Sequence, residues 1–378
     1  MPELAVQPPS VAIAAITAEL VRVPVEPPVA FATRLVRNRE YVLVTVRDAD
    51  GGEGVGYTYA GDQGGALVAA AVELIAPLLV DRPAWAVEGN WAHCFQELLL
   101  VGRRGAVIRA LSAVDIACWD LRGKLAGQSL QRMLGSDVAE VPAYASGGYY
   151  KTEDHLEDLR DQVQHYLDRG FVDFKIKFGR LPLAQDLPRV QLARELIGPE
   201  GRLALDINNG WLNLAQSLPA VYALAEHDIW WIEEPFAPDD VANHRALAER
   251  SPVPIATGET EATRWGFAQL IEQRAAHVLQ PDACVAGGIS EFMKIANAAA
   301  CFSLPVAPHW HANLHAPLVA ASPTGDVVEY FDASLGVFNF EDLVSNPLVV
   351  EQGRIQLCDD PGIGVSFDEQ ALERWRVR

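Results

Sequence analysis

Nine charged or polar side chains recur through the second half of the 378-residue chain at intervals that suit a shared site. From Lys177 to Glu329 the successive strand ends that carry them are 20 to 29 residues apart, which is about the length of one strand followed by one helix. Each stands at or near the end of a short run with strand composition. We therefore expect them to converge at one edge of a parallel sheet. They are Lys175, Lys177, Asp206, Asn208, Glu233, Glu259, Asp282, His309 and Glu329.

Three of these residues are carboxylates at successive strand ends: Asp206, Glu233 and Glu259. Three uncompensated negative charges that face one point are costly, and a divalent cation is the simplest way to neutralise them. Oxygen donors without a thiolate favour Mg²⁺ or Mn²⁺ over Zn²⁺, and positions left open for water or substrate are typical of Mg²⁺. The alternative is that each acid caps the helix that follows it. We predict a Mg²⁺ site.

Glu234 competes with Glu233 for one of these ligand positions, because the two residues are adjacent. Neighbouring residues of a strand point to opposite faces, so only one of the pair is expected to face inward, and we assign that place to Glu233. The same alternation places Asp206 and Asn208 on a shared inward face.

Lys175 and Lys177 also share a face of their strand. Two lysines side by side are expected to lower each other's pKa, which leaves a neutral amine able to act as a base near neutral pH. The alternative is a pair of lysines that are solvated or bridged by carboxylates.

Asp282 and His309 end consecutive strands and are expected to be neighbours. A carboxylate hydrogen-bonded to one imidazole nitrogen orients the ring and stabilises its protonated form, so the pair forms a general acid/base dyad. His311 and His315 are interpreted as ordinary core or loop residues, since their spacing suggests zinc only weakly and the loop can hold solvated histidines. Glu329 is interpreted as a hydrogen-bonding carboxylate of the site, or else as the partner of a basic neighbour.

The elements that position these residues follow from the hydrophobic pattern. Residues 11–60 alternate with the period of strands, with a turn at Gly51-Gly52, and residues 64–135 change to helical periodicity, which together indicate an α+β domain. Strand and helix then alternate eight times, the pattern of a parallel barrel. The eight strand-like runs are Val141–Gly147, Val172–Phe178, Arg202–Asn208, Ile229–Glu233, Pro254–Glu259, His277–Asp282, Leu304–His309 and Asp326–Phe331.

Three regions result from this pattern: a capping domain at residues 1–138, a barrel at 139–335, and a C-terminal tail at 336–378 that is expected to return to the capping domain. A barrel of roughly 250 residues with a smaller domain fits the length of the chain. The substrate is expected to be selected by two capping segments, 25–37 and 56–64, where Phe31, Tyr57 and Tyr59 are candidates to line the mouth of the barrel.

The composition excludes several classes of partner. A net charge of −20 disfavours nucleic acid and anionic membrane surfaces, and no apolar stretch suits a membrane span. Five cysteines without a paired motif argue against a disulfide framework and fit a reducing cytoplasm. We expect a cytoplasmic protein with a small-molecule partner.

Six short motifs resemble those of the enolase superfamily, specifically its mandelate racemase group. They are Lys175-Ile-Lys177, Asp206-Ile-Asn208, Ile232-Glu233-Glu234-Pro235, Gly258-Glu259, Pro281-Asp282 and Pro308-His309. The segment from Ser112 to Leu121, with Asp115 and Asp120, is similar to a helix of the capping domain of that family. The resemblance implies a modified (β/α)₇β barrel, capped by an N-terminal α+β domain that the C-terminal tail completes. It also implies a homo-oligomer.

The resemblance further implies roles for the nine residues. Asp206, Glu233 and Glu259 would bind Mg²⁺, and Lys177 and the Asp282–His309 dyad would be the two acid/base catalysts. The substrate would be a small carboxylate, neutralised by Lys175, and its enediolate would be hydrogen-bonded by Glu329. Asp282 stands where muconate-cycloisomerase-type members have a lysine, which places the chain with the racemases and sugar-acid dehydratases.

Dehydration of an acid sugar to a 2-keto-3-deoxy acid is the activity we predict, because it is the commoner one in this group. It would make the enzyme a Mg²⁺-dependent lyase. The alternative is racemisation or epimerisation of a 2-hydroxy acid, which shares removal of the α-proton. A non-catalytic barrel that only binds a ligand is the more distant alternative, since it has little reason to keep metal ligands and both bases together.

Overall fold

The computed structural model describes residues 11–151 and 155–377 of the chain. Its first part is an antiparallel three-stranded sheet with helices packed on it, as the sequence predicts. The turn between the second and third strands is closed by the Asp48 carboxylate, which accepts hydrogen bonds from the amides of Asp50 and Gly52, while Gly51 has a φ of 89°. The elements of this part are β1 (Ile13–Ala30), β2 (Leu35–Asp48), β3 (Glu53–Tyr59), α1 (Gly65–Leu79), α2 (Val87–Glu97), α3 (Ala106–Ala126) and α4 (Leu130–Met133).

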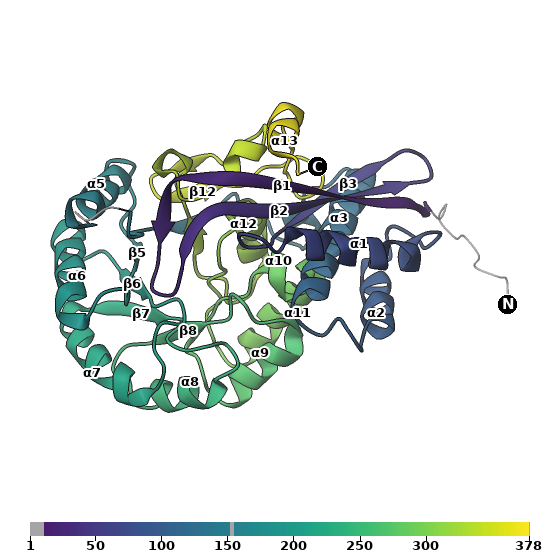
Figure 1. Ribbon diagram of the computed structural model, residues 1–378. Helices are drawn as coiled ribbons and strands as arrows, with labels where there is room; N and C mark the ends of the chain where they lie inside the picture. The colour runs from purple at the N-terminus through teal and green to yellow at the C-terminus, as the bar shows by residue number, and fades with distance from the viewer. Residues whose placement is uncertain (1–10, 152–154, 378) are drawn as a thin grey trace.

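The second part is a barrel of parallel strands surrounded by helices, which confirms the predicted fold class. Figure 1 shows helices α5 to α9 curving around the strands, and the long β1–β2 ribbon lying across them. Its strands are β4 (Glu140–Gly147), β5 (Phe174–Lys177), β6 (Leu203–Asp206), β7 (Ile229–Glu233), β8 (Ile255–Thr257), β9 (Val278–Leu279) and β10 (Val328–Tyr330). Its helices are α5 (His155–Asp168), α6 (Leu183–Ile197), α7 (Leu214–Leu224), η1 (Ala225–His227), α8 (Val241–Ala248), α9 (Thr263–Glu272), α10 (Ala283–Ala286), α11 (Gly288–Cys301) and α12 (Ala312–Ala321).

The predicted strand run at 304–309 is the main difference within the barrel. This segment makes only isolated parallel bridges, from Val306 to Leu279 and from Val306 to Gly325, while β10 pairs with β4 and brings the two ends of the sheet together. The pattern cannot distinguish such a segment from a strand, because an apolar run at the barrel wall is buried in either case.

The interior of the barrel is filled by two large aromatic side chains among small ones. Trp231 is fully buried there with Ala204, Ala256 and Ala307, and Tyr144 packs against its indole with ring centroids 5.4 Å apart. The small residues leave the space that the indole occupies, so the barrel is a packed core with its chemistry confined to the rim.

Buried polar contacts attach the capping domain to the barrel. Asp115 of α3 accepts hydrogen bonds from the amide and hydroxyl of Ser290 in α11, at 2.9 and 2.7 Å, and Trp119 donates to the same hydroxyl at 2.9 Å. Asp120 accepts from the amides of Val55 and Ile363. The two acids of the capping-domain motif are therefore structural.

The C-terminal segment contacts both other parts of the chain. Strand β12 pairs with β4 of the barrel, while Arg376 forms an ion pair with Glu19 of β1 at 2.7 Å and Asn339 donates to the carbonyl of Pro24. Its elements are η2 (Ala333–Leu335), η3 (Glu341–Leu343), β11 (Val350–Glu351), β12 (Arg354–Gln356) and α13 (Glu369–Trp375). Within the described residues, no helix is both long and apolar enough to cross a membrane.

Candidate active site

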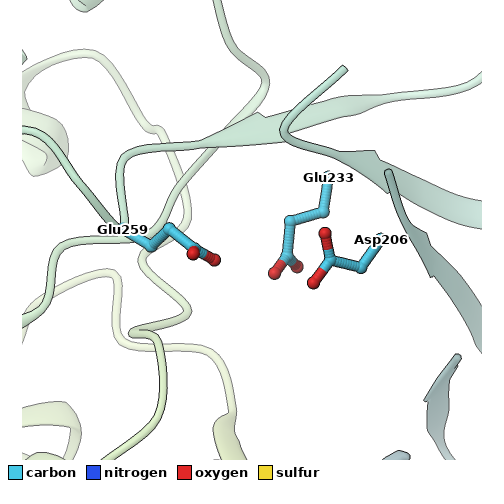
Figure 2. Close-up of side chains that lie close together, drawn as sticks. All are labelled: Asp206, Glu233 and Glu259. Carbon is cyan, nitrogen blue, oxygen red and sulfur yellow. The ribbon is translucent and has the colours of Figure 1, made fainter. Parts of the chain in front are cut away.

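The strand register places the first site residues in one row. Lys177 of β5 is paired with Asp206 of β6, and Asp206 is paired with Glu233 of β7. Glu259 follows β8 by two residues. One carboxylate oxygen from each of the three acids lies within 4.8 Å of the others, and Figure 2 shows the three side chains converging from separate strand ends. The structure thus brings together the predicted metal ligands.

Two of the three carboxylates are held in place by neighbouring donors. Oε2 of Glu233 accepts hydrogen bonds from Trp231 Nε1 at 3.0 Å and from Gln280 Nε2 at 2.6 Å. Asp206 accepts from the backbone amide of Asn208 at 2.8 Å and from its side-chain amide at 3.1 Å. Such supporting contacts fix the direction in which a carboxylate presents its free electron pairs to a cation.

The third carboxylate fits a cation because one of its buried oxygens receives no hydrogen bond. Oε2 of Glu259 is buried without a hydrogen bond to any described residue. Burial and the negative charges of Glu234 and Asp206 raise the pKa of Glu259 well above its usual value. A divalent cation would remove both the repulsion and the unmet electron pairs, and three carboxylates without a thiolate are a donor set for Mg²⁺.

The two lysines differ from the sequence prediction in their protonation. Nζ of Lys175 contacts Glu233, while Nζ of Lys177 lies 2.5 Å from Asp206. Burial lowers the pKa of each lysine, but the adjacent carboxylates raise it by more, so both values lie above normal. Lys175 does lower the pKa of Lys177, as predicted, but the carboxylates outweigh this effect. The predicted neutral amine was therefore wrong for this arrangement, and the structure shows the alternative of lysines bridged by carboxylates.

Glu329 is fully buried beneath the cavity and is part of the same charge network. One of its carboxylate oxygens lies 2.7 Å from Lys175 Nζ and the other accepts from the amide of Trp310 at 2.7 Å. Burial raises its pKa, but the positive charges of Lys175, His309 and Lys177 together more than offset this and bring the value down to about 2. In this arrangement Glu329 is an ionised acceptor that orients Lys175.

His309 and Asp282 are neighbours, as expected. His309 Nδ1 lies 3.0 Å from Asp282 Oδ2, and its Nε2 lies 3.6 Å from Glu259 Oε2. Burial raises the pKa of Asp282, but the hydrogen bond to His309 and the nearby imidazoles lower it to about 2, so this carboxylate is ionised near neutral pH. Lys177 lies beside Asp206 and His309 lies beside Glu259, which puts the two acid/base candidates at separate sides of the carboxylate cluster.

The other two histidines of this segment are core residues, one of the two ordinary roles that the sequence left open, and they are not solvated. His311 and His315 are fully buried, and burial lowers their pKa values to about 3 and about 4. His311 packs against the rings of Tyr57 and Phe340, with centroids 5.0 and 5.1 Å away. The capping domain and the tail cover this loop, which a local pattern cannot indicate.

A cavity of about 380 Å³ opens above the carboxylate cluster, between the barrel and the capping domain. Five of the nine predicted residues line it; they are Lys177, Asn208, Glu259, Asp282 and His309. The other four, Lys175, Asp206, Glu233 and Glu329, are fully or almost fully buried below it. Of the aromatic residues expected at the mouth, Phe31 and Tyr59 line the cavity, whereas Tyr57 is fully buried outside it.

Glu234 also lines this cavity, which the strand-alternation argument did not predict. Its φ of 41° turns the backbone out of the strand geometry, so the rule that neighbours face opposite sides ends at Glu233. Asn209 donates to its carboxylate at 3.0 Å. Burial and the charges of Asp206 and Glu233 raise its pKa to about 7.

The cavity residues outside the predicted set include Arg39, Tyr149 and Trp310. Arg39 stands on β2 and its guanidinium lies over the Trp310 ring, 4.3 Å from the centroid. The sequence feature that could have indicated Arg39 is its position in an alternating strand, two residues beyond the segment 25–37 that we expected to select the substrate.

Comparisons with known proteins agree with this geometry. A family model described as "Mandelate racemase / muconate lactonizing enzyme, N-terminal domain" matches residues 14–135, and one described as "Enolase C-terminal domain-like" matches residues 158–371. Together these matches cover more than half of the chain.

Individual relatives extend over most of the chain. Arabinonate dehydratase of Saccharolobus solfataricus is 31% identical over 90% of this chain and 91% of its own length. The 3,6-anhydro-alpha-L-galactonate cycloisomerase of Streptomyces coelicolor is 33% identical over 89% of this chain and 92% of its own. The crystal structure of a racemase from Streptomyces coelicolor A3(2) with bound magnesium superposes with a TM-score of 0.91, at 31% identity, over 97% of this chain and 100% of that one.

Proposed function

The chain belongs to the mandelate racemase and muconate lactonizing enzyme family of the enolase superfamily, and from that premise we propose that it is a Mg²⁺-dependent dehydratase of an acid sugar. One observation carries the proposal: Lys177 and the His309–Asp282 dyad face the same cavity from separate sides of a three-carboxylate cluster. A relative at 31% identity is named arabinonate dehydratase, which supports dehydration as the reaction.

Asp206, Glu233 and Glu259 would hold the metal ion. When bound, Mg²⁺ supplies positive charge that stabilises a substrate carboxylate as negative charge develops on it. Lys175 adds a second positive charge below the carboxylates, and Glu329 and Glu233 fix its position. The enzyme thereby lowers the cost of an enediolate before any proton moves.

The chemical step begins with transfer of the α-proton to the neutral form of Lys177 or of His309. Lys177 would reach this form when a cation at Asp206 offsets the negative charge that raises the pKa of the lysine. The electron pair of the C–H bond passes into the carboxylate to give the enediolate, which then re-forms a C=C bond as the β-hydroxyl leaves. That hydroxyl takes a proton from the opposite residue and departs as water, and the resulting enol becomes the 2-keto-3-deoxy acid. His309 suits the acid role, because the contact with ionised Asp282 through Nδ1 fixes the orientation of its ring.

Racemisation or epimerisation is the second candidate, and the same observation supports it. Acid/base groups on two sides of the cluster are what removal of a proton on one face and its return on the other require. The magnesium-bound structure named as a racemase and the relative named as a cycloisomerase support this alternative. The two reactions separate after the first proton transfer, so a product assay distinguishes them.

The test is a screen of acid sugars and 2-hydroxy acids with Mg²⁺ present, scored for 2-keto acid formation and for change of optical rotation. We expect a 2-keto product from at least one acid sugar, and loss of that product in the presence of EDTA. Change of rotation without keto product would establish the racemase. Equal ligand binding with and without metal, together with no turnover of any compound, would contradict both reactions and indicate a barrel that only binds its ligand.

A further inference from the structure

The capping-domain side of the cavity contains a buried positive charge that the proposed reaction does not use. Arg39 of β2 lines the cavity and is only 2% exposed. It lies among aromatic rings, with its guanidinium 4.3 Å from the centroid of Trp310 and 5.7 Å from that of Tyr59. Rings of this kind stabilise a cation but do not neutralise it.

The guanidinium of Arg39 has incomplete partners. Its Nε donates to the carbonyl of Val337 at 2.9 Å, and Nη1 donates to the hydroxyl of Tyr59 at a long 3.4 Å. Nη2 is buried without a hydrogen bond, and no carboxylate among the described residues forms an ion pair with this arginine. Burial lowers its pKa, but the hydroxyls of Tyr59, Tyr149 and Tyr41 raise it by more, so the side chain stays charged.

Such an arrangement is costly unless an anion completes it. An unpaired buried charge with an unsatisfied donor carries a large desolvation penalty. Removing one partner of a buried ion pair is strongly destabilising for the same reason. The planar guanidinium is suited to a carboxylate, because its N–H groups match two carboxylate oxygens. The missing partner is therefore expected to come with the ligand.

We propose that Arg39 binds a second carboxylate, at the end of the substrate remote from the metal cluster, and that the substrate is a dicarboxylic acid sugar. This inference rests on the proposed function and names the substrate class of that site. One carboxylate of the diacid would lie at the Asp206–Glu233–Glu259 cluster and the other at Arg39, with the sugar carbons in the 380 Å³ cavity between them. Arg39 is thus a specificity-determining residue supplied by the capping domain.

The test compares ligands that differ only at the remote end. Galactarate and galactonate, and glucarate and gluconate, form two pairs in which a carboxylate replaces a hydroxymethyl group. Binding is measured by calorimetry with Mg²⁺ in a Lys177→Ala background, so that the ligands remain intact. We expect the diacid of at least one pair to bind more tightly by roughly 30-fold or more, as for loss of one partner of a buried charge pair.

Arg39→Gln in the same background should reduce this preference to near unity while leaving the affinity for the monoacid unchanged. Arg34→Gln is the matched control, because Arg34 lines the same cavity but is exposed, and it should keep the preference. Arg39→Lys keeps the positive charge but not the planar set of donors, and it should retain part of the preference for the diacid. This variant also provides the test if Arg39→Gln does not fold.

Three results would overturn the proposal. They are equal affinity for both members of every pair, equal weakening of both members by Arg39→Gln, and tighter Arg39-dependent binding of a phosphorylated hexonate than of either diacid. Turnover by the enzyme with Lys177 intact is scored separately. An Arg39-dependent preference without any 2-keto product would remove the proposed dehydration and leave the diacid site standing. A 2-keto product without an Arg39-dependent preference for the diacid would support the proposed dehydration and remove the diacid site.

Discussion

The carboxylate of Asp282 is the most informative single group to alter. It lies 3.0 Å from His309 Nδ1, and its other oxygen accepts from the amide of Cys284 at 2.7 Å at the start of α10. In Asp282→Asn the amide oxygen can keep the contact with the backbone, but the amide NH₂ then faces the imidazole. His309 Nδ1 must become an acceptor, which moves the ring proton to Nε2 and removes the stabilisation of the protonated ring.

The magnitude follows from the bond that is lost. A hydrogen bond to a charged group contributes roughly 1.5–3 kcal/mol, which corresponds to roughly 10- to 150-fold in rate. Because the pKa of Asp282 is about 2, the group is ionised above about pH 4, and its contribution is lost only as the pH falls toward 2. The ionisation of Asp282 itself should therefore add no pH dependence to the kcat of the parent between pH 6 and 9.

The assay is steady-state turnover of the substrate found in the screen, with the unfolding midpoint measured in parallel. Asp240→Asn is the matched control, because Asp240 caps α8 through the amide of Asn243 in the same way but lies outside the cavity. It should leave kcat unchanged. A correctly folded Asp282→Asn protein with the kcat of the parent would refute the dyad.

Three further predictions concern the ligands and the buried acids. Glu233→Gln should weaken Mg²⁺ binding in calorimetry far more than Glu234→Gln; the reverse order would contradict the ligand assignment. Trp231→Phe removes the indole donor to Glu233 and should weaken Mg²⁺ binding roughly 10-fold, while an unchanged affinity would show that this contact does not orient the ligand. Burial raises the pKa of Asp115 to about 7, so the folded protein should lose stability as the pH rises from 4 to 7, by roughly 4 kcal/mol. In urea unfolding, Asp115→Asn should remove most of this dependence of the unfolding free energy on pH. An unchanged dependence would show that another group causes it.

The barrel and its rim were predictable because both depend on local periodicity. Each strand–helix unit places its last strand residues at the same edge, so the spacing from Lys177 to His309 predicted a convergence that the register of β5, β6 and β7 confirms. The choice of oxygen ligands for a divalent cation likewise follows from residue type. Periodicity fails where the backbone leaves regular geometry, as at Glu234, whose positive φ brings a second acid into the cavity.

Burial by another domain was not predictable from the local pattern. The local sequence around His311 does not indicate whether this residue is buried. In the structure it packs against the rings of Tyr57 and Phe340, which come from the capping domain and the tail. Arg39 lines the cavity only because β2 lies across the barrel, a long-range arrangement that alternation within the strand does not specify. The raised pKa of Lys177 also depends on distances to carboxylates of other strands.

The central claim is that two residues on separate sides of the carboxylate cluster exchange protons with one substrate. It is tested by NMR in D₂O with Mg²⁺, following the α-proton signal and the 2-keto product in the parent, in Lys177→Ala, in His309→Asn and in the double variant. For a dehydratase we expect His309→Asn to stop formation of the product; if Lys177 is the base, α-proton exchange persists in that variant and is lost in Lys177→Ala. For a racemase, each variant should lose exchange in one stereoisomer. A double variant that turns over the substrate at the rate of the parent would contradict the claim.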